Sequence, residues 1–146
     1  MPDWKQNAIS DLREYENVKQ SLTAIPEQYK EINARITSIR ASGTTSTPIQ
    51  GGCSAQEDAM INAIDKKERL RINYGVARSK INRMERGLKS LSDNERRVLE
   101  LFYINRTNDY IDRLCEEMGY ERAKIYVLKD AAVKKFTLCM FGITDI

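Results

Sequence analysis

Residues 111–128, which read IDRLCEEMGYERAKIYVL, decide the fold of this chain. Seven positions have the residue types of a helix-turn-helix: Ile111, Leu114, Cys115, Met118, Gly119, Ile125 and Leu128. Cys115 is small enough for the point where two helices cross, and Gly119 tolerates the positive φ of the corner. In such a motif the second helix can present its outer face to the major groove of DNA. The same spacing also describes a small three-helix core without a DNA role.

A helix start precedes this stretch. The tetrad Ser92-Asp93-Asn94-Glu95 has the pattern of a capping box, in which the first and last side chains each bond the other's backbone N–H. It predicts a third helix from Glu95 to Ile104. The apolar face of that helix is formed by Val98, Leu99, Leu101, Phe102 and Tyr103.

The N-terminal half predicts a helical hairpin. Residues 3–40 are helical by pattern, and from Leu22 onward their apolar side chains recur in steps of three and four. This seam favours a coiled coil, with a surface amphipathic helix as the alternative. Pro26 lies inside it and is expected to kink or split the helix. Residues 41–53 are small, polar and glycine-rich, which predicts a flexible loop.

A second capping box, Ser54-Ala55-Gln56-Glu57, predicts the start of the returning helix. The steps of three and four give it a seam of Met60, Ile64, Lys67, Arg71, Tyr74, Ala77, Ile81, Met84, Leu88 and Leu91. Between Lys66 and Lys89 there are nine basic residues and two acidic ones. This excess favours contact with a nucleic acid or an acidic protein, while a solvated coiled-coil face explains part of it.

Charge is unevenly distributed, although the chain as a whole carries only +3. Residues 92–146 carry nine basic and ten acidic side chains, so the expected DNA-binding end is not basic overall. Phosphate attraction there depends on local placement, with help from the basic middle segment.

The stretch from Leu91 to Tyr103, LSDNERRVLELFY, resembles the opening of region four of bacterial sigma factors. The strings Arg122-Ala123-Lys124-Ile125 and Ala132-Val133-Lys134-Lys135-Phe136 are similar to the recognition helix of that region. More of the chain resembles a narrower group, the ArpU- and RinA-like late-gene regulators of prophages in Gram-positive bacteria. The features in common are the helical N-terminus, the Gly-rich loop, and the strings Ser54 to Asp58 and Ile64 to Glu68. The resemblance implies sequence-specific control of phage transcription.

Three residues differ from the sigma pattern and limit what the resemblance implies about DNA recognition. Ala123 and Val127 replace polar base-reading residues of the sigma pattern, and Tyr126 replaces an arginine. The promoter element of ordinary sigma factors is therefore not expected to be read. A helix-turn-helix that contacts RNA polymerase or another regulator without touching DNA is the alternative.

Double-stranded DNA is the expected partner, contacted in two ways. The candidates for the groove are Arg122, Lys124 and Tyr126. The candidates for phosphate contacts are Arg106, Lys129, Lys134 and Lys135.

Other function classes find little support. The chain has no histidine, and its three cysteines, Cys53, Cys115 and Cys139, lack metal-ligand spacing. We expect no metal, no cofactor and no enzymatic activity, because neither a P-loop nor a nucleophile elbow is present. Free thiols, no signal peptide and no transmembrane span are typical of a cytoplasmic protein.

The sequence therefore predicts an all-α protein in two parts. Residues 1–91 form a coiled-coil-like helical hairpin with its loop at 41–53, and residues 92–146 form the helix-turn-helix domain. A homo-oligomer held by the N-terminal helices is expected, since helix-turn-helix proteins commonly pair to bind two half-sites.

Overall fold

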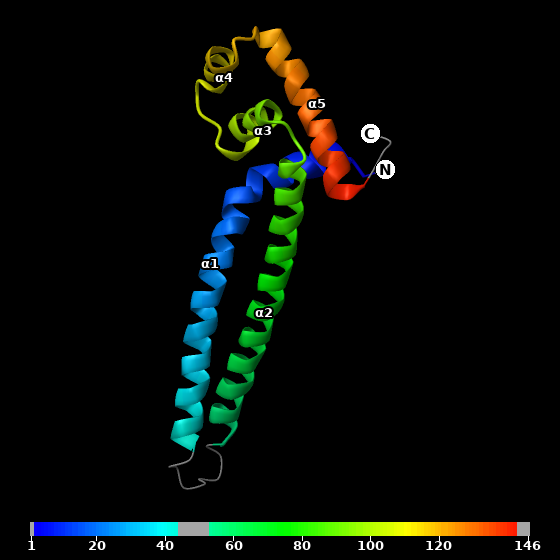
Figure 1. The fold of residues 1–146 in the computed structure, drawn as a ribbon. Helices are drawn as coiled ribbons and strands as arrows, with labels where there is room; N and C mark the ends of the chain where they lie inside the picture. Colours follow the sequence, from blue (N-terminus) through cyan, green and yellow to red (C-terminus); the bar gives the residue numbers. More distant parts are fainter. Residues whose placement is uncertain (1, 44–52, 143–146) are drawn as a thin grey trace. The chain divides into compact units, whose positions relative to one another are not determined.

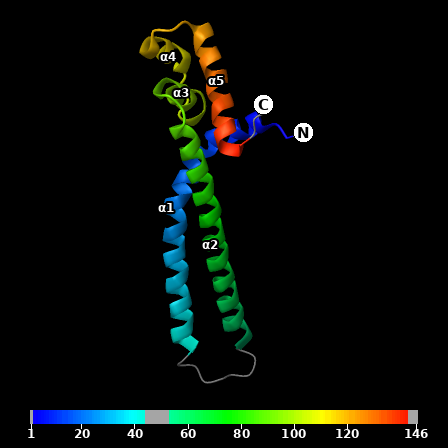
Figure 2. The same cartoon turned by 45° about the vertical axis from the view of Figure 1, so that its right-hand side comes forward.

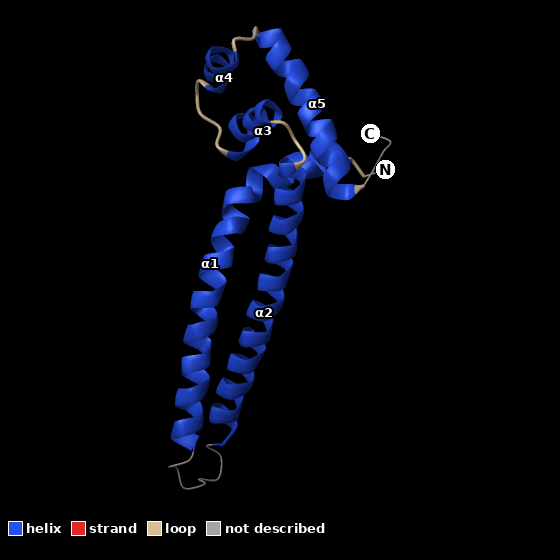
Figure 3. Ribbon diagram, viewed as in Figure 1, coloured by secondary structure: helices blue, strands red, loops and turns tan. Residues whose placement is uncertain are grey.

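The protein is all-α in the computed structural model, which describes residues 2–43 and 53–142. Figures 1 and 3 show helices joined by short turns, and no strand occurs in these two ranges. The elements, in chain order, are α1 (Trp4–Gly43), α2 (Cys53–Lys89), α3 (Asp93–Leu99), η1 (Glu100–Ile104), α4 (Tyr110–Met118) and α5 (Arg122–Phe141). The predicted fold class, a long helical hairpin followed by a helix-turn-helix, is confirmed.

Two compact units make up the chain. One contains residues 1–18 and 79–146, and the other contains residues 19–78. The boundary that the sequence suggested between residues 91 and 92 thus falls inside the first unit. The loop predicted at 41–53 falls mainly on residues outside the described ranges, although α1 continues to Gly43 and α2 already begins at Cys53.

The second unit is a hairpin of α1 and α2, which lie side by side in Figures 1 and 2. Its core consists of Ile32, Ile36, Ala63 and Leu70, each less than 9% exposed. Around them pack Ile25, Tyr29, Ile39 and Met60. The α1 side of this core follows the predicted seam. Pro26 does not split α1, which continues as a single helix to Gly43.

The predicted seam of α2 is wrong at two positions in its first half, Ile64 and Arg71. Ile64 is 47% exposed and Arg71 is exposed, whereas Ala63 and Leu70 are buried. The seam that contacts α1 runs from Met60 through Ala63, Lys67 and Leu70, in steps of three, four and three residues. Arg71 lies outside this seam. Its guanidinium stays in solvent, where it bonds Glu68 at 2.6 Å.

Lys67 does belong to the seam, and an aromatic ring explains how a lysine is accommodated there. Its Nζ lies 5.4 Å from the centroid of the Tyr29 ring. The face of an aromatic ring attracts a cation, so the ammonium keeps a favourable neighbour while its stem covers apolar surface.

In the first unit, α3 begins as the sequence predicts. The Ser92 hydroxyl accepts the Glu95 N–H at 3.3 Å, and a Glu95 carboxylate oxygen accepts the Ser92 N–H at 3.0 Å. The expected helix to Ile104 is only partly α-helical, because Glu100–Ile104 form a π-helical turn. Val98, Leu99, Leu101 and Phe102 are all buried across this junction.

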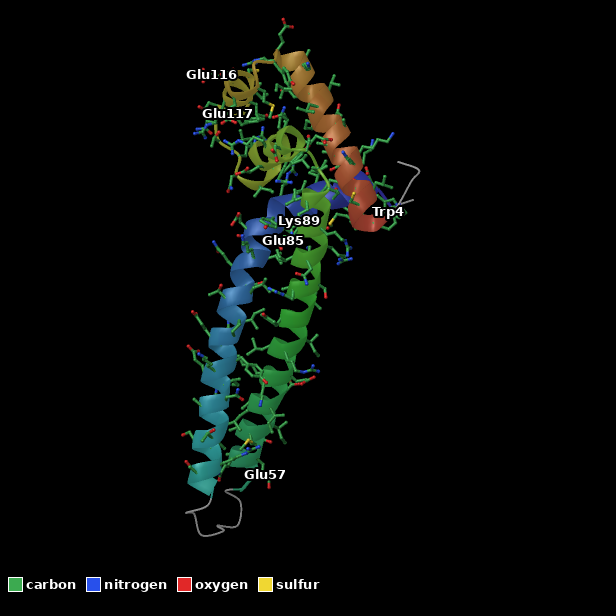
Figure 4. The ribbon with its side chains drawn as sticks, in the orientation of Figure 1. Trp4, Glu57, Glu85, Lys89, Glu116 and Glu117 are labelled. Atoms are coloured by element: carbon green, nitrogen blue, oxygen red, sulfur yellow. The ribbon has the colours of Figure 1, made fainter. Side chains whose placement is uncertain are left out.

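The ends of the two long helices complete this unit. Gly87 of α2 lies so close to α5 that a Cβ there would be 2.9 Å from the Phe136 ring. At the start of α1, the Trp4 ring lies 5.1 Å from the Phe141 ring, and Figure 4 shows it beside the last turn of α5. The second half of α5 is therefore buried by residues outside 92–146.

No helix within the described residues is long and apolar enough to span a bilayer.

Candidate nucleic-acid interface

The corner between α4 and α5 has the geometry of a helix-turn-helix. Three residues, 119–121, separate the two helices. Gly119 has φ 69° and ψ 28°, which is the left-handed conformation that a residue with a Cβ rarely adopts. Its N–H donates to the Cys115 carbonyl at 2.9 Å and closes α4. The role predicted for Gly119 is confirmed.

A small apolar core holds the motif together. Val98, Leu101, Phe102, Leu114 and Ile125 are its buried members. The remaining predicted slots, Ile111, Cys115, Met118 and Leu128, are half-buried and pack against this core. Since α3 and η1 supply three of the five buried residues, the orientation of α5 depends on the helix that precedes the motif.

The residues proposed for the groove all lie in the first turns of α5 and are exposed. Arg122 donates to the Asp112 carboxylate of α4 at 2.9 Å, with both side chains 67% exposed. This contact raises the pKa of Arg122, first through the hydrogen bond and then through the opposite charge. Any acceptor that binds this guanidinium must therefore compete with Asp112.

Two further candidates are placed by aromatic rings. The Lys124 ammonium lies 3.9 Å from the centroid of the Tyr120 ring. Tyr126 is 43% exposed and packs edge-on against Phe102 at 5.9 Å. This ring contact packs part of Tyr126 against the core while the rest of the side chain stays exposed.

Arg106 lies in the turn before α4. Its guanidinium donates to the Tyr110 hydroxyl at 2.8 Å and lies 4.4 Å from the centre of that ring. The side chain is exposed and has no ion pair with a carboxylate in the described chain. A full positive charge thus remains accessible at the entrance to the motif.

The three lysines proposed for phosphate contacts differ in their surroundings. Lys129 is only 22% exposed, bonds Asp130 at 2.6 Å and lies over the Phe102 ring. Lys135 reaches Glu95 at 3.4 Å, whereas Lys134 is exposed without an ion pair to a described residue. Lys134 is thus the most accessible cation of the three.

The outward line of α5 is largely apolar, which was not predicted from the sequence. Val127 is 69% exposed and Leu138 is 39% exposed, while Ala123 and Ala131 are exposed small residues between and beside them. These four positions share one helical face, on which the exposed Lys134 also lies. The departures from the sigma pattern at Ala123 and Val127 were the signal for this surface.

A second cationic surface lies near the end of α2, within the same unit. Arg83, Arg86 and Lys89 are exposed, and none forms an ion pair with a carboxylate among the described residues. Lys89 is labelled in Figure 4. Lys80, by contrast, is bound by Asp11 and Glu14 at 3.2 Å each. Burial acts to lower the pKa of Lys80, but the hydrogen bonds and charges of the two carboxylates together raise it.

The first helix of the motif, α4, carries exposed carboxylates near its end. Glu116 and Glu117 lie on the exposed side of α4 (Figure 4). Both oxygens of Glu117 accept hydrogen bonds from Arg97 at 2.9 Å, so this carboxylate fastens α4 to α3. The contact lowers the pKa of Glu117 and raises that of Arg97. No cluster of three potential metal ligands occurs in the described ranges.

The comparisons with known proteins place the chain in a family without assigning it an activity. Neither the curated proteins nor the solved structures contain a match. A family described as "Protein of unknown function (DUF1492)" matches residues 35–137. This match takes in only the end of α1, but all of α2 and nearly all of the helix-turn-helix. The chain therefore belongs to the DUF1492 family.

Proposed function

We propose that this protein is a sequence-specific, double-stranded-DNA-binding regulator of transcription that acts on prophage late genes. The supporting observation is the corner at Gly119, from which α5 starts with Arg122, Lys124 and Tyr126 exposed. Helix-turn-helix proteins read bases with the N-terminal residues of this second helix. The prophage role comes from the resemblance of the sequence to ArpU- and RinA-like regulators.

The proposal divides the cations by role. Arg122 has the planar fork that can contact two acceptors on a guanine edge. Arg106 and Lys134 are accessible for phosphates, as are Arg83, Arg86 and Lys89 at the end of α2. The latter three offset the net negative charge of residues 92–146, so non-specific attraction to DNA comes largely from α2.

The ion pair between Arg122 and Asp112 provides the sharpest test. Asp112→Asn should tighten binding to duplexes from a prophage late-promoter region, because it frees Arg122 and removes a negative charge. Arg122→Ala should weaken binding to the preferred duplex by about 1–3 kcal/mol. Both side chains are 67% exposed, so neither change should alter the circular dichroism spectrum. Unchanged affinity in both variants, measured by gel shift at fixed salt, would remove α5 from the interface.

A second candidate is a protein-interaction module that binds RNA polymerase or another regulator without direct DNA contact. The exposed apolar residues Ala123, Val127 and Ala131 favour it, since depletion of charge is typical of the centre of a protein interface. Lys134 and Leu138 would then lie toward the edge of that contact. Val127→Lys distinguishes the two candidates. It should preserve or increase DNA binding, but it should abolish capture of purified polymerase if this face is a protein contact.

The proposal also includes a cytoplasmic homo-oligomer held by the N-terminal helices. Pairing would present two recognition helices to two half-sites, about one helical turn of DNA apart.

A further inference from the structure

We propose that two copies of this chain associate through the outer face of α2, antiparallel to each other across a two-fold axis near Glu68. This inference deepens the oligomer included in the proposed function by naming its surface and symmetry. All the residues involved belong to the hairpin unit of residues 19–78.

The outer face of α2 carries four exposed large apolar side chains. Ile61, Ile64, Ile72 and Val76 are 62%, 47%, 52% and 64% exposed. They lie away from the α1 contact, which α2 makes through Ala63 and Leu70. A second seam on α2, opposite the first, is formed by Ile61, Asp65, Glu68, Ile72 and Val76. These residues are spaced by four, three, four and four positions.

The surface also permits close approach. Gly75 lies on the same side as this second seam, and a Cβ added there would meet nothing within 4 Å. Two helices can pack most closely where one of them lacks a side chain. The core of the hairpin has only four buried residues, so burial of this face would add to its stability.

Among the described residues of this unit, α2 carries all the exposed large apolar side chains, and α1 carries none. The face that best complements α2 is therefore α2 of a second copy. Closed homodimers use such self-complementary contacts, in which residue i meets residue j and j meets i.

Charge fixes the direction of the pairing. Residues 57–68 carry four carboxylates and two lysines, whereas residues 69–78 carry three arginines and no acid. An antiparallel arrangement sets the acidic part of each helix against the basic part of the other. A parallel arrangement would set each part against itself.

The register follows from the apolar residues. With the axis near Glu68, Ile61 faces Val76 of the second copy and Ile64 faces its Ile72. The same register brings Asp58 opposite Arg78. At the centre, Asp65–Arg69 and Glu68–Arg71 are already ion-paired within each chain at 2.8 and 2.6 Å. The two Glu68 carboxylates that meet near the axis are thus each accompanied by a cation.

The test uses the full chain without DNA, in sedimentation equilibrium over a concentration series. The wild type should be a dimer. Ile72→Glu should raise the dimer dissociation constant by about tenfold or more, equivalent to at least 1.4 kcal/mol, because the two-fold axis introduces the change twice. Asn73→Glu is the matched control, since this neighbour is also exposed but points off the face. Circular dichroism should show unchanged helix content in both variants, as both positions are exposed in one copy.

A charge exchange tests the direction. Arg78→Asp alone and Asp58→Arg alone should each weaken the dimer, and the double variant should restore it. A wild-type monomer would overturn both this interface and the oligomer in the proposed function. A dimer insensitive to Ile72→Glu, or a double variant no tighter than its parents, would overturn the antiparallel α2 interface alone. None of these results bears on DNA binding, which the Arg122 and Asp112 variants measure.

Discussion

At the scale of single residues, Ser92 and Gly119 were predictable because each performs a local backbone task. A capping residue and a left-handed corner are set by the few residues around them, so their sequence patterns carry over directly into structure. The contacts of Arg122 and Lys129 were not predictable. Their partners, Asp112 and the Phe102 ring, depend on how α4, η1 and α5 meet.

The capping box gives the first prediction. Ser92→Ala should lower the free energy of unfolding by about 1 kcal/mol, because the Glu95 N–H loses its acceptor. Urea denaturation followed by circular dichroism measures the change. Asn94→Ala, an exposed position in the same turn, is the control and should have a much smaller effect. Equal effects in the two variants would contradict a capping role.

Glu95 gives a prediction for pH. The hydrogen bond from the Ser92 N–H lowers the pKa of Glu95, with further help from the Ser92 hydroxyl and Lys135 and against the effect of burial. A lowered pKa in the folded state stabilises the fold above the ordinary glutamate pKa of about 4.3, and this stabilisation disappears as the pH falls through the folded value. Glu95→Gln should therefore flatten the acid side of the stability profile. An unchanged slope below that pH would argue against it.

Gly119 gives a third prediction at this scale. Gly119→Ala should cost about 1–2 kcal/mol, since the Cβ is unfavourable in the left-handed region. A Cβ there meets nothing within 4 Å, so the cost comes from the backbone alone. Gly119→Asn should be milder because asparagine tolerates this region. Thermal unfolding of the two variants compares them, and equal losses would point to a steric cause instead.

At the scale of elements, periodicity predicted every long helix but not every face. The seam of α1 was correct because its isoleucines and tyrosine define a single stripe. In α2 the neighbours Ala63 and Ile64 both fit a seam, as do Leu70 and Arg71, so the sequence alone left the choice open. Packing against α1 selected Ala63 and Leu70. The π-helical turn at Glu100–Ile104 was missed because hydrophobic pattern does not reveal one extra residue in a turn.

A substitution at Ile32 tests the packing between α1 and α2 in the hairpin. It is 4% exposed in the core between α1 and α2, so Ile32→Asp places a charge among buried apolar side chains. Helix content should fall, and the free energy of unfolding should decrease by about 3 kcal/mol or more. Ala34→Asp, on the exposed side of α1, is the control. Full helicity of the Ile32 variant in circular dichroism would contradict the assigned core. The substitution is therefore a test of folding rather than of oligomerisation.

At the scale of the whole molecule, the structural unit and the sequence motif have different limits. Residues 92–146 contain the complete helix-turn-helix pattern, yet α5 also buries Phe136 and Met140 close to Gly87 of α2. Residues 1–18 contribute Ala8 and Leu12, both fully buried. Long-range contacts of this kind leave no mark on local sequence periodicity.

This gives a prediction about fragments. Residues 92–146 alone should unfold at a lower temperature and less cooperatively than the full chain, because the second half of α5 loses its cover. A chain in which a short glycine-rich linker replaces residues 19–78 should retain a cooperative transition, since it keeps the whole first unit. Calorimetry on both fragments decides between the two boundaries. If residues 92–146 melt as cooperatively as the linked chain, the motif is sufficient as a domain.

The ring contact between Trp4 and Phe141 has a practical consequence. Trp4 is the only tryptophan of the chain, and it reports from the unit that carries the helix-turn-helix. Its intrinsic fluorescence should shift to longer wavelength when the start of α1 leaves α5, whatever happens to the hairpin of residues 19–78. Far-UV circular dichroism follows the helices of both units. Recorded together during denaturation, the two signals would separate the unfolding of one unit from that of the other without any added label.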